Sequence, residues 1–537
     1  MHAVSSQIQR LEEVQGSTPR ELKKLLAPRY IGTGNQSCVP TLRAEQKRPT
    51  TKQTAMIIGR PITLPIHHKL IRVLWASLAV TTLLVGICQS IRGQVGDAIL
   101  ESPESTPSPT PAGGGAATLF QNVRIFDGKS AVLSAPSNVL VKGNIIERIS
   151  ASPIAVDKND SVRIIEGNGR VLMPGLIDAH WHAFMAATSL QTLMSSSSSY
   201  LHLLAAREAE ATLMRGFTTV SDCGGPVFGL KRAIDDGTVI GPRIYPSGAF
   251  ISQTSGHGDF RFHFELPRRM GGPLSYSEKE GIAAIADSPD EVRLRAREQL
   301  REGASQIKLM AGGGVSSQYN PIESVQYTEA EIRAAVEAAD NWGTYVTVHA
   351  YTPPAIQQAV AAGAKCIEHG QLIDEPTAKL LADKGIWWSL QPFIYDQARL
   401  AAMSPVSQKK ALEMWAGTEN AYGLAKKYKI KPAFGTDILF DPEAANRQGS
   451  YITRLLRWYT SAEALKMATA DNGELMSLCG YINPYPGKLG VVQEAALADL
   501  LLVDGNPLEN IKLVEEPDRN FLVIMKDGKI YKDSLPK

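Results

Sequence analysis

The 537-residue chain has little of what marks several common protein classes. Its net charge is only +2, which gives no global basis for binding nucleic acid. Its five cysteines are odd in number and widely spaced, so they predict neither a disulfide framework nor a C-x-x-C site. We expect Cys223 and Cys366, in apolar segments, to be small core residues rather than nucleophiles. The serine run 195–199 has no nucleophile-elbow context and receives no catalytic role.

Long apolar runs are also scarce, and the most conspicuous one is short. Residues 73–87 are fifteen apolar or small residues that follow Lys69 and Arg72, whereas a membrane span needs about 20. The run suits the apolar region of a secretory signal at about 69–92, which predicts a secreted or periplasmic protein. The alternative is an uncleaved anchor that tethers the protein to a membrane through 73–87. Met56 is a candidate start in place of Met1.

Composition divides the whole chain into three parts, of which the third, 173–475, lies between the two halves of the second. Residues 1–117 form an extension that ends in a linker rich in Pro, Ser, Thr and Gly. Residues 118–172 and 476–537 both contain short alternating strands separated by glycine turns. Neither end can bury its apolar face alone, so we expect the two ends to form one small β-sandwich beside the central domain.

Residues 173–475 alternate between strand-like and helical segments, which predicts an α/β fold. Eight βα units would make a (β/α)₈ TIM barrel. The predicted strands lie in segments 171–182, 217–224, 243–251, 306–312, 344–351, 366–371, 387–393 and 432–438. Thr328 and Glu331 predict a capping box at the start of one helix. An open doubly wound sheet is the fold alternative, but no glycine-rich phosphate loop follows the first strand.

Metal-competent side chains recur where these strands end. His180 and His182 alternate with Trp181, so both imidazoles share one face of the first strand. The later strands add Lys308, His349, His369 and Asp437. Each alone is more often structural, but barrel chemistry collects at the C-terminal ends of the strands. Together the six predict a metal site.

Several motifs carry a family resemblance from about Leu119 to the end of the chain. They are VLMPGLIDAHWH, SQTSGHGD around His257, IKLMAGGGVSS, VTVHAYTPPAIQQAVAAGAKCIEHG and FGTD. The chain resembles the amidohydrolase superfamily, most closely its Xaa-Pro-dipeptidase-like and ochratoxin-amidase-like metal-dependent members.

The resemblance implies a binuclear centre with two zinc or other divalent ions. Lys308, carbamylated by CO₂, would bridge the ions. The ligands of one ion would be His180, His182 and Asp437, and those of the other His349 and His369. Metal-bound hydroxide would attack the scissile carbonyl, with Asp437 as the proton shuttle. By family likeness His257 would contact substrate, and the alternative is that it orients a neighbouring loop. Tyr351, two residues beyond His349 on the same strand face, would reach the substrate carboxylate or the oxyanion, and the alternative is a tyrosine packed at the barrel mouth.

We therefore expect a hydrolase for the amide bonds of dipeptides or N-acyl amino acids. The alternatives are hydrolysis of cyclic amides, lactones or phosphoesters by the same cluster, and a catalytically silent barrel used as a binding scaffold. The partner would be a small molecule; a homo-oligomer is left open. The insertion 260–276, with Arg261, Arg268 and Arg269, would be a lid or, as the simpler interpretation, a solvated basic loop.

Overall fold

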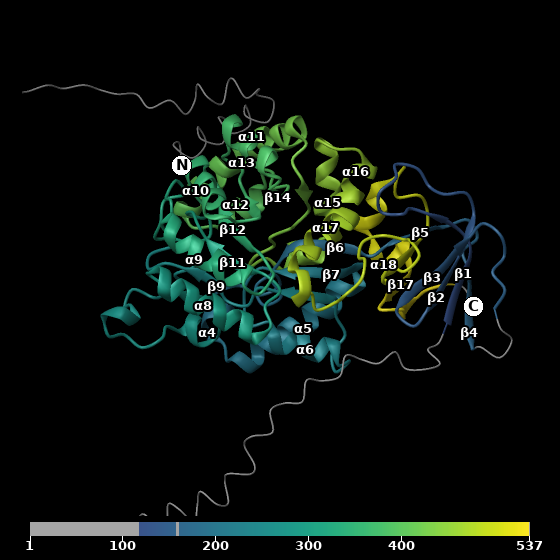
Figure 1. Ribbon diagram of the computed structural model, residues 1–537, viewed down its shortest axis with the longest axis horizontal. Helices are drawn as coiled ribbons and strands as arrows, with labels where there is room; N and C mark the ends of the chain where they lie inside the picture. The colour runs from purple at the N-terminus through teal and green to yellow at the C-terminus, as the bar shows by residue number, and fades with distance from the viewer. Residues whose placement is uncertain (1–116, 157–160, 536–537) are drawn as a thin grey trace, which may run out of the picture. The chain divides into compact units, whose positions relative to one another are not determined.

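The computed structural model describes residues 117–156 and 161–535 (Figure 1). The predicted signal segment and the linker lie outside these residues, so both stay predictions. Within the described part of the chain, no helix has the length and apolar character needed to cross a membrane.

Both ends of the described chain contribute strands to one eight-stranded sheet. Its strands are β1 (Ala117–Ile125), β2 (Ser137–Lys142), β3 (Ile145–Ser150), β4 (Val162–Glu166), β5 (Val171–Pro174), β16 (Leu500–Val503), β17 (Phe521–Lys526) and β18 (Lys529–Asp533). The order is β18-β17-β16-β5-β1-β2-β3, and β4 pairs with β1. Figure 1 shows the early strands β1 to β4 in the same region as the late strand β17. Strands from the two chain ends therefore pair in one flanking sheet.

Turn chemistry and apolar alternation explain this sheet. Gly143 and Asn144 connect β2 to β3, while Asp527 and Gly528 connect β17 to β18 with φ values of 55° and 71°. Two-residue turns with positive φ favour Asn, Asp and Gly, which fit the twist of a hairpin. Side chains from both ends, such as Val139 and Val523, meet in one hydrophobic cluster. This shared cluster explains why neither end forms the sheet alone.

The remaining strands are parallel and form two sheets. One sheet contains β6 (Leu176–Trp181), β7 (Phe217–Asp222) and β8 (Arg243–Pro246). The other has the order β10-β9-β11-β12-β13-β14-β15. Its strands are β9 (Phe250–Ser252), β10 (Ala283–Ile285), β11 (Ile307–Met310), β12 (Val346–Ala350), β13 (Cys366–His369), β14 (Trp387–Ser389) and β15 (Pro432–Ala433). The α/β class with parallel strands is thus confirmed.

The two sheets do not join into one closed eight-stranded ladder in the described residues, in contrast to the prediction. Backbone hydrogen bonds nevertheless link the two sheets at two places. Ala179 N donates to Phe434 O at 2.9 Å, which connects β6 to the segment after β15. Ser305 N donates to Pro246 O at 2.7 Å, which connects β8 to the segment before β11. The architecture is therefore TIM-barrel-like, with two irregular seams.

Two predicted strands are divided in the structure, and one observed strand was not predicted. Segment 171–182 is divided at Gly175, because β5 pairs with β16 in the flanking sheet and only β6 joins the barrel. Segment 243–251 is divided into β8 and β9 around Gly248, which has a φ of 69°. The short strand β10 was not predicted, because three residues are too few to show alternation.

Helices follow most of the parallel strands. The longer ones are α5 (Ser198–Met214), α6 (Phe228–Asp235), α8 (Pro289–Glu302), α9 (Glu329–Asp340), α10 (Pro353–Ala362), α11 (Glu375–Lys384) and α13 (Pro405–Tyr428). The shorter ones are α4 (Leu190–Ser195), α7 (Tyr276–Lys279), α12 (Gln397–Ala402), α14 (Pro442–Asn446), α15 (Ser450–Arg454), α16 (Ser461–Lys466), α17 (Asn472–Met476) and α18 (Pro517–Asn520). The predicted capping box of Thr328 and Glu331 is present at α9.

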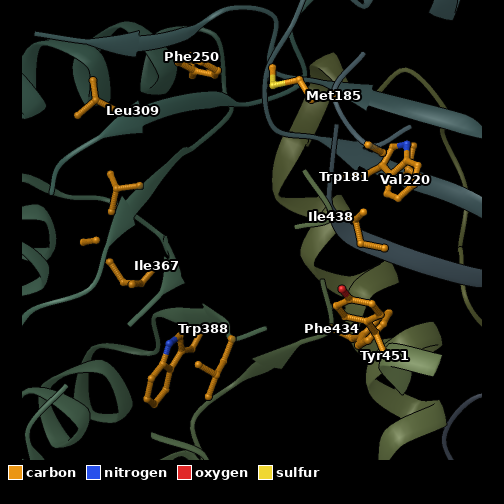
Figure 2. Close-up of a cluster of buried hydrophobic side chains, with 14 of the residues drawn as sticks. Trp181, Met185, Val220, Phe250, Leu309, Ile367, Trp388, Phe434, Ile438 and Tyr451 are labelled. Atoms are coloured by element: carbon orange, nitrogen blue, oxygen red, sulfur yellow. The ribbon is translucent and has the colours of Figure 1, made fainter. Parts of the chain in front are cut away.

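The core of the barrel-like domain joins both parallel sheets. Figure 2 shows Trp181 and Val220, from β6 and β7, in the same buried cluster as Leu309 and Trp388, from β11 and β14. Trp181 is buried, as predicted for the residue between two histidines that face the other way. This packing fixes the strand ends on which the site depends.

A buried ion pair joins the barrel-like domain to the flanking sheet. Arg243 Nε lies 2.9 Å from Asp499 Oδ2, and both side chains are buried. We expect Arg243→Met to lower the free energy of unfolding by about 3–5 kcal/mol, because it leaves a buried carboxylate without its partner. Arg163→Met, which removes an exposed pair with Asp533, should cost less than about 1 kcal/mol. Urea unfolding of both variants measures the difference, and equal losses would contradict this role.

Candidate metal centre

The six side chains predicted as metal ligands lie together at the C-terminal ends of the parallel strands. His180 lies on β6 and His182 just beyond it, Lys308 on β11, and His349 and His369 on β12 and β13; Asp437 follows β15. All six are buried, with exposed fractions between 1% and 8%. Six polar side chains in such a position are costly unless they satisfy one another or a ligand.

Asp437 lies at the centre of this cluster. Its Oδ1 is 3.4 Å from His180 Nε2 and 3.3 Å from His182 Nε2. Its Oδ2 is 4.0 Å from His369 Nδ1. Lys308 Nζ is 3.5 Å from His180 Nε2. Ligand atoms of His180, His182 and Asp437 all lie within 4.8 Å of one another, a separation that one ion can bridge after small side-chain movements.

The other predicted side chains extend the cluster as a series of rings. His349 lies beside His369, with ring centroids 4.4 Å apart. His257 stacks on His349 at 4.2 Å. The centroid of the Tyr351 ring lies 5.0 Å from the centroids of both the His349 and the His369 ring. The two predicted substrate contacts, His257 and Tyr351, are therefore next to the predicted ligands rather than elsewhere on the surface.

In three of the histidines, one ring nitrogen has a hydrogen-bond partner, and this contact orients the second ring nitrogen of the same imidazole. His180 Nδ1 is 2.7 Å from Glu368 Oε2, and His182 Nδ1 is 3.3 Å from the carbonyl oxygen of Gly224. Both Nε2 atoms thus face Asp437. His349 Nε2 is 3.0 Å from the carbonyl oxygen of Gly313. A ligand imidazole commonly has such a partner on its second nitrogen, which fixes its orientation and tautomer.

The protonation states suit metal binding. Burial lowers the pKa of His180, His349 and His369. Burial alone would raise the pKa of Asp437, but His180, His182 and Lys308 outweigh burial and hold that pKa well below its usual range. Neutral imidazoles and an ionised carboxylate are the forms that bind a divalent cation. His369 Nδ1 has no hydrogen-bond partner among the described residues, so this nitrogen is available as a metal ligand.

The backbone at two of these residues is unusual. His369 has a φ of 78° and Asp437 a φ of 44°, both in the left-handed region that non-glycine residues seldom adopt. Such strain costs about 1–3 kcal/mol per residue and is found at functional sites more often than elsewhere. Here it turns two side chains at strand ends towards the cluster.

Two buried carboxylates that support the cluster were not predicted. Glu368 accepts one hydrogen bond from Thr347 Oγ1 at 2.6 Å and another from His180 Nδ1 at 2.7 Å. Asp178 accepts from Thr436 Oγ1 at 2.6 Å and from His180 N at 3.0 Å. Asp178 therefore ties β6 to the turn that contains Asp437. The available signal was that each is an acidic residue in an otherwise apolar strand segment, where only a paired carboxylate is tolerated.

Burial acts differently on the pKa values of these two carboxylates. Burial raises the pKa of Asp178 to about 6, against the hydrogen bonds from Thr436 and Gln448. Burial also acts to raise the pKa of Glu368, but His180 and Lys308 outweigh it and lower this pKa to about 2. Glu368 is therefore the ionised partner of the His180 imidazole.

A second group of possible ligand atoms contains His180, Cys223 and Glu368. It fits an ion less well than the group around Asp437. Burial raises the pKa of the Cys223 thiol well above its usual value, whereas a thiol binds metal as the thiolate. The nitrogen that His180 would offer, Nδ1, is already bonded to Glu368. The neutral, buried thiol agrees with its predicted packing role.

Glu368→Gln should lower metal affinity by about 10- to 100-fold, because the amide weakens the partner that orients His180. Competition with a chelator of known affinity measures this loss. The matched control is Glu278→Gln, another buried glutamate, which lies on α7 and should retain the affinity of the unmodified protein. If Glu368→Gln binds metal as tightly as this control, Glu368 has no orienting role.

The arginines of the insertion 260–276 face acidic partners of their own. Arg261 pairs with Asp259 at 2.5 Å, and Arg269 with Glu291 at 2.8 Å; Arg268 lies 3.6 Å from Glu291. Their charges are therefore balanced within the protein. This favours the simpler interpretation of a basic surface loop.

Comparison with known proteins agrees with this geometry. Residues 171–531 match the model of the amidohydrolase family. Ochratoxinase from Aspergillus niger is 32% identical over 383 residues, which cover 67% of this chain and 76% of that protein.

Two solved structures extend the likeness. A prolidase complexed with N-methylphosphonate-L-proline is 33% identical, with a TM-score of 0.71, over 78% of this chain and 100% of that chain. A Xaa-Pro dipeptidase with methionine bound in its active site is 27% identical, with a TM-score of 0.67, over the same shares. The predicted likeness to the ochratoxin-amidase and Xaa-Pro-dipeptidase group is thus confirmed.

Proposed function

The chain belongs to the amidohydrolase family and is a hydrolase that acts on amide bonds, and we propose that it is a binuclear metal-dependent enzyme for dipeptides or N-acyl amino acids. One observation carries the proposal: five separate strand ends bring four imidazoles, an amine and a carboxylate into one buried cluster. The relatives support the substrate class, because the complexed prolidase contains a proline derivative.

The donor set fits two divalent ions. His180, His182 and Asp437 would hold one ion, and His349 and His369 the other. Lys308, as a carbamate formed with CO₂, would join them, which also removes the cost of burying a cationic amine. Two ions held in this way would polarise the scissile carbonyl of the substrate and would lower the pKa of a bound water towards neutrality.

Asp437 would transfer the proton. It is ionised at neutral pH, since its pKa lies below the usual range, so it can accept a proton from the attacking water. The protonated carboxyl would then donate to the leaving amine, which completes amide cleavage without a second titrating group.

His257 and Tyr351 would hold the carboxylate of the leaving amino acid. Burial raises the pKa of Tyr351, so the phenol stays protonated and can donate a hydrogen bond. Burial lowers the pKa of His257 to about 3, so its ring is neutral and also has an N–H to donate. His257 Nδ1 has no partner among the described residues, which leaves this atom available.

A substrate panel tests the proposal. The purified full chain, loaded with zinc, is assayed on dipeptides and N-acyl amino acids and, in parallel, on lactones and organophosphates. We expect cleavage of the first group with kcat/KM above about 10⁴ M⁻¹s⁻¹ for the best substrate. Cleavage of lactones or phosphoesters alone would favour the alternative function, and a protein that fails to retain zinc and cleaves none of the substrates would favour a binding scaffold.

We also propose export to the periplasm or the cell exterior through residues 69–92. The apolar run 73–87 supports this proposal. N-terminal sequencing of the protein from a secretory host, with and without this segment, separates a cleaved signal from a membrane anchor.

A further inference from the structure

A cavity of about 290 Å³ borders the metal centre. It is lined by residues that follow β14 and β15 and by α12, α14 and α15. Phe393 forms part of its wall, and the Phe393 ring lies nearly parallel to the His369 ring, with centroids 6.5 Å apart. The cavity is therefore separated from a predicted metal ligand by one aromatic ring.

Three arginines line this cavity, which we name the arginine cavity: Arg399, Arg447 and Arg454. None of them forms an ion pair with any carboxylate in residues 117–156 and 161–535, in contrast to the paired arginines of the insertion. Arg399 lies over the Phe393 ring at 5.5 Å, and Arg454 lies over the Tyr451 ring at 4.0 Å. Stacking on aromatic rings holds two guanidinium groups in place without neutralising them.

Two aspartates also line the cavity, but both carboxylates have other partners. Asp396 Oδ1 accepts a hydrogen bond from Arg399 N at 3.0 Å, as the N-cap of α12. Asp441 Oδ1 accepts from Ala444 N at 2.9 Å, as the N-cap of α14. The lining thus contains three cationic side chains and two anionic ones that are turned towards helix ends. An anion with two oxygens would match the guanidinium groups.

The position of the cavity relative to the other side chains indicates which part of a substrate would enter it. Of the two side chains proposed above to hold the carboxylate of the leaving amino acid, His257 stacks on His349, and Tyr351 contacts both His349 and His369. Phe393 contacts the cluster through His369, a ring on which His257 does not stack. The volume is just below the ~300–1,000 Å³ of whole-ligand sites, so the cavity suits one substituent of a small substrate.

We propose that the arginine cavity binds a second carboxylate, located on the acyl side of the scissile amide. The preferred substrates are then dianionic: N-acyl amino acids with an acidic acyl group, or dipeptides that begin with glutamate or aspartate. This inference rests on the proposed amide hydrolase function and names its substrate class.

Matched substrates test the inference. The zinc-loaded full chain is assayed with N-glutaryl-L-leucine and with N-glutaramoyl-L-leucine, in which an amide replaces the carboxylate of the acyl group. We expect kcat/KM to be at least about tenfold higher for the carboxylate, since a charge-assisted hydrogen bond is worth this much or more. Arg399→Met and Arg454→Met should each reduce this ratio several-fold. Arg457→Gln, an exposed arginine paired with Glu419, is the control and should keep it.

A binding measurement separates this inference from the function on which it rests. Glutarate is titrated calorimetrically into the full chain and into the same variants, with the diamide glutaramide as the neutral probe. We expect glutarate to bind and the two arginine variants to weaken it about tenfold or more. The inference would be overturned if the ratio of kcat/KM between the two substrates and the affinity for glutarate were the same in all proteins. Amide hydrolysis would then remain the proposed function. Absence of any amide cleavage would overturn the proposed function, and the glutarate affinities would then decide whether the cavity binds a carboxylate.

Discussion

Asp437→Asn is expected to lower kcat for amide hydrolysis by about 10²- to 10⁴-fold, the usual contribution of a general acid–base group. The amide is close in size to the carboxylate and keeps an oxygen near His180 and His182, which lie 3.4 and 3.3 Å from Oδ1. It cannot accept and return a proton. The bound metal should therefore fall far less than the rate, as measured by elemental analysis and kinetics on one preparation.

The comparison between rate and metal content separates two roles for Asp437. A shuttle predicts low activity per bound ion, whereas a ligand without a shuttle role predicts activity that falls only in proportion to the metal lost. The second outcome would remove proton transfer by Asp437 from the proposed mechanism. Asp374→Asn is the control, because this aspartate caps α11, outside the cluster and the arginine cavity, and should leave the metal content and the rate unchanged.

Lys308→Met should abolish the second metal equivalent and lower kcat/KM by about 10³-fold or more. The side chain is 1% exposed, and its Nζ lies 3.5 Å from His180 Nε2. Methionine fills similar volume but cannot form the carbamate that would join the two ions. Losing one of two ions removes part of the charge that stabilises the transition state, an effect of several kcal/mol.

Lys526→Met provides the matched control for this prediction. Lys526 is also a buried lysine, but its Nζ donates to the carbonyl oxygen of Gly241, away from the cluster. This variant should retain two metal equivalents. If Lys308→Met also retains them, Lys308 does not join the ions. Reconstitution of metal-free unmodified protein should in addition depend on bicarbonate, which supplies the CO₂ for the carbamate.

Much of the cluster could be predicted from the sequence because strand geometry is regular. His180 and His182 had to share a face, and parallel strand ends had to meet at one edge. Lys308, His349, His369 and Asp437 then fell, in that order, at the fourth, fifth, sixth and eighth predicted strands. The backbone geometry at His369 and Asp437, with positive φ values, left no comparable signal in the sequence.

The supporting groups were harder to predict because their partners are distant in sequence. Glu368 bonds to His180 and Asp178 to Thr436 and Gln448, and no periodic pattern connects such pairs. The same is true of the arginine cavity, whose arginines lie on α12, just after α14 and on α15. The prediction had instead considered arginines in the insertion 260–276, where local acidic partners neutralise them.

In the fold as well, features set by neighbouring residues were predictable, whereas features set by distant residues were not. The hairpin turns at Gly143 and Asp527 and the capping box of Thr328 depend on neighbouring residues, and they were predictable. The division of 171–182 at Gly175 depends on the distant strand β16. A Cβ on Gly175 would lie 2.0 Å from Thr218 Oγ1, so the close approach of β7 requires glycine there, a contact that only the folded chain reveals.

The number of metal ions bound per chain decides whether the buried cluster is a binuclear centre. Elemental analysis of the purified full chain, after saturation with zinc and removal of excess ion, should give two equivalents, with no more than one in His180→Ala. A zinc-saturated protein that retains no tightly bound ion, or that retains two equivalents in His180→Ala as well, would contradict the account.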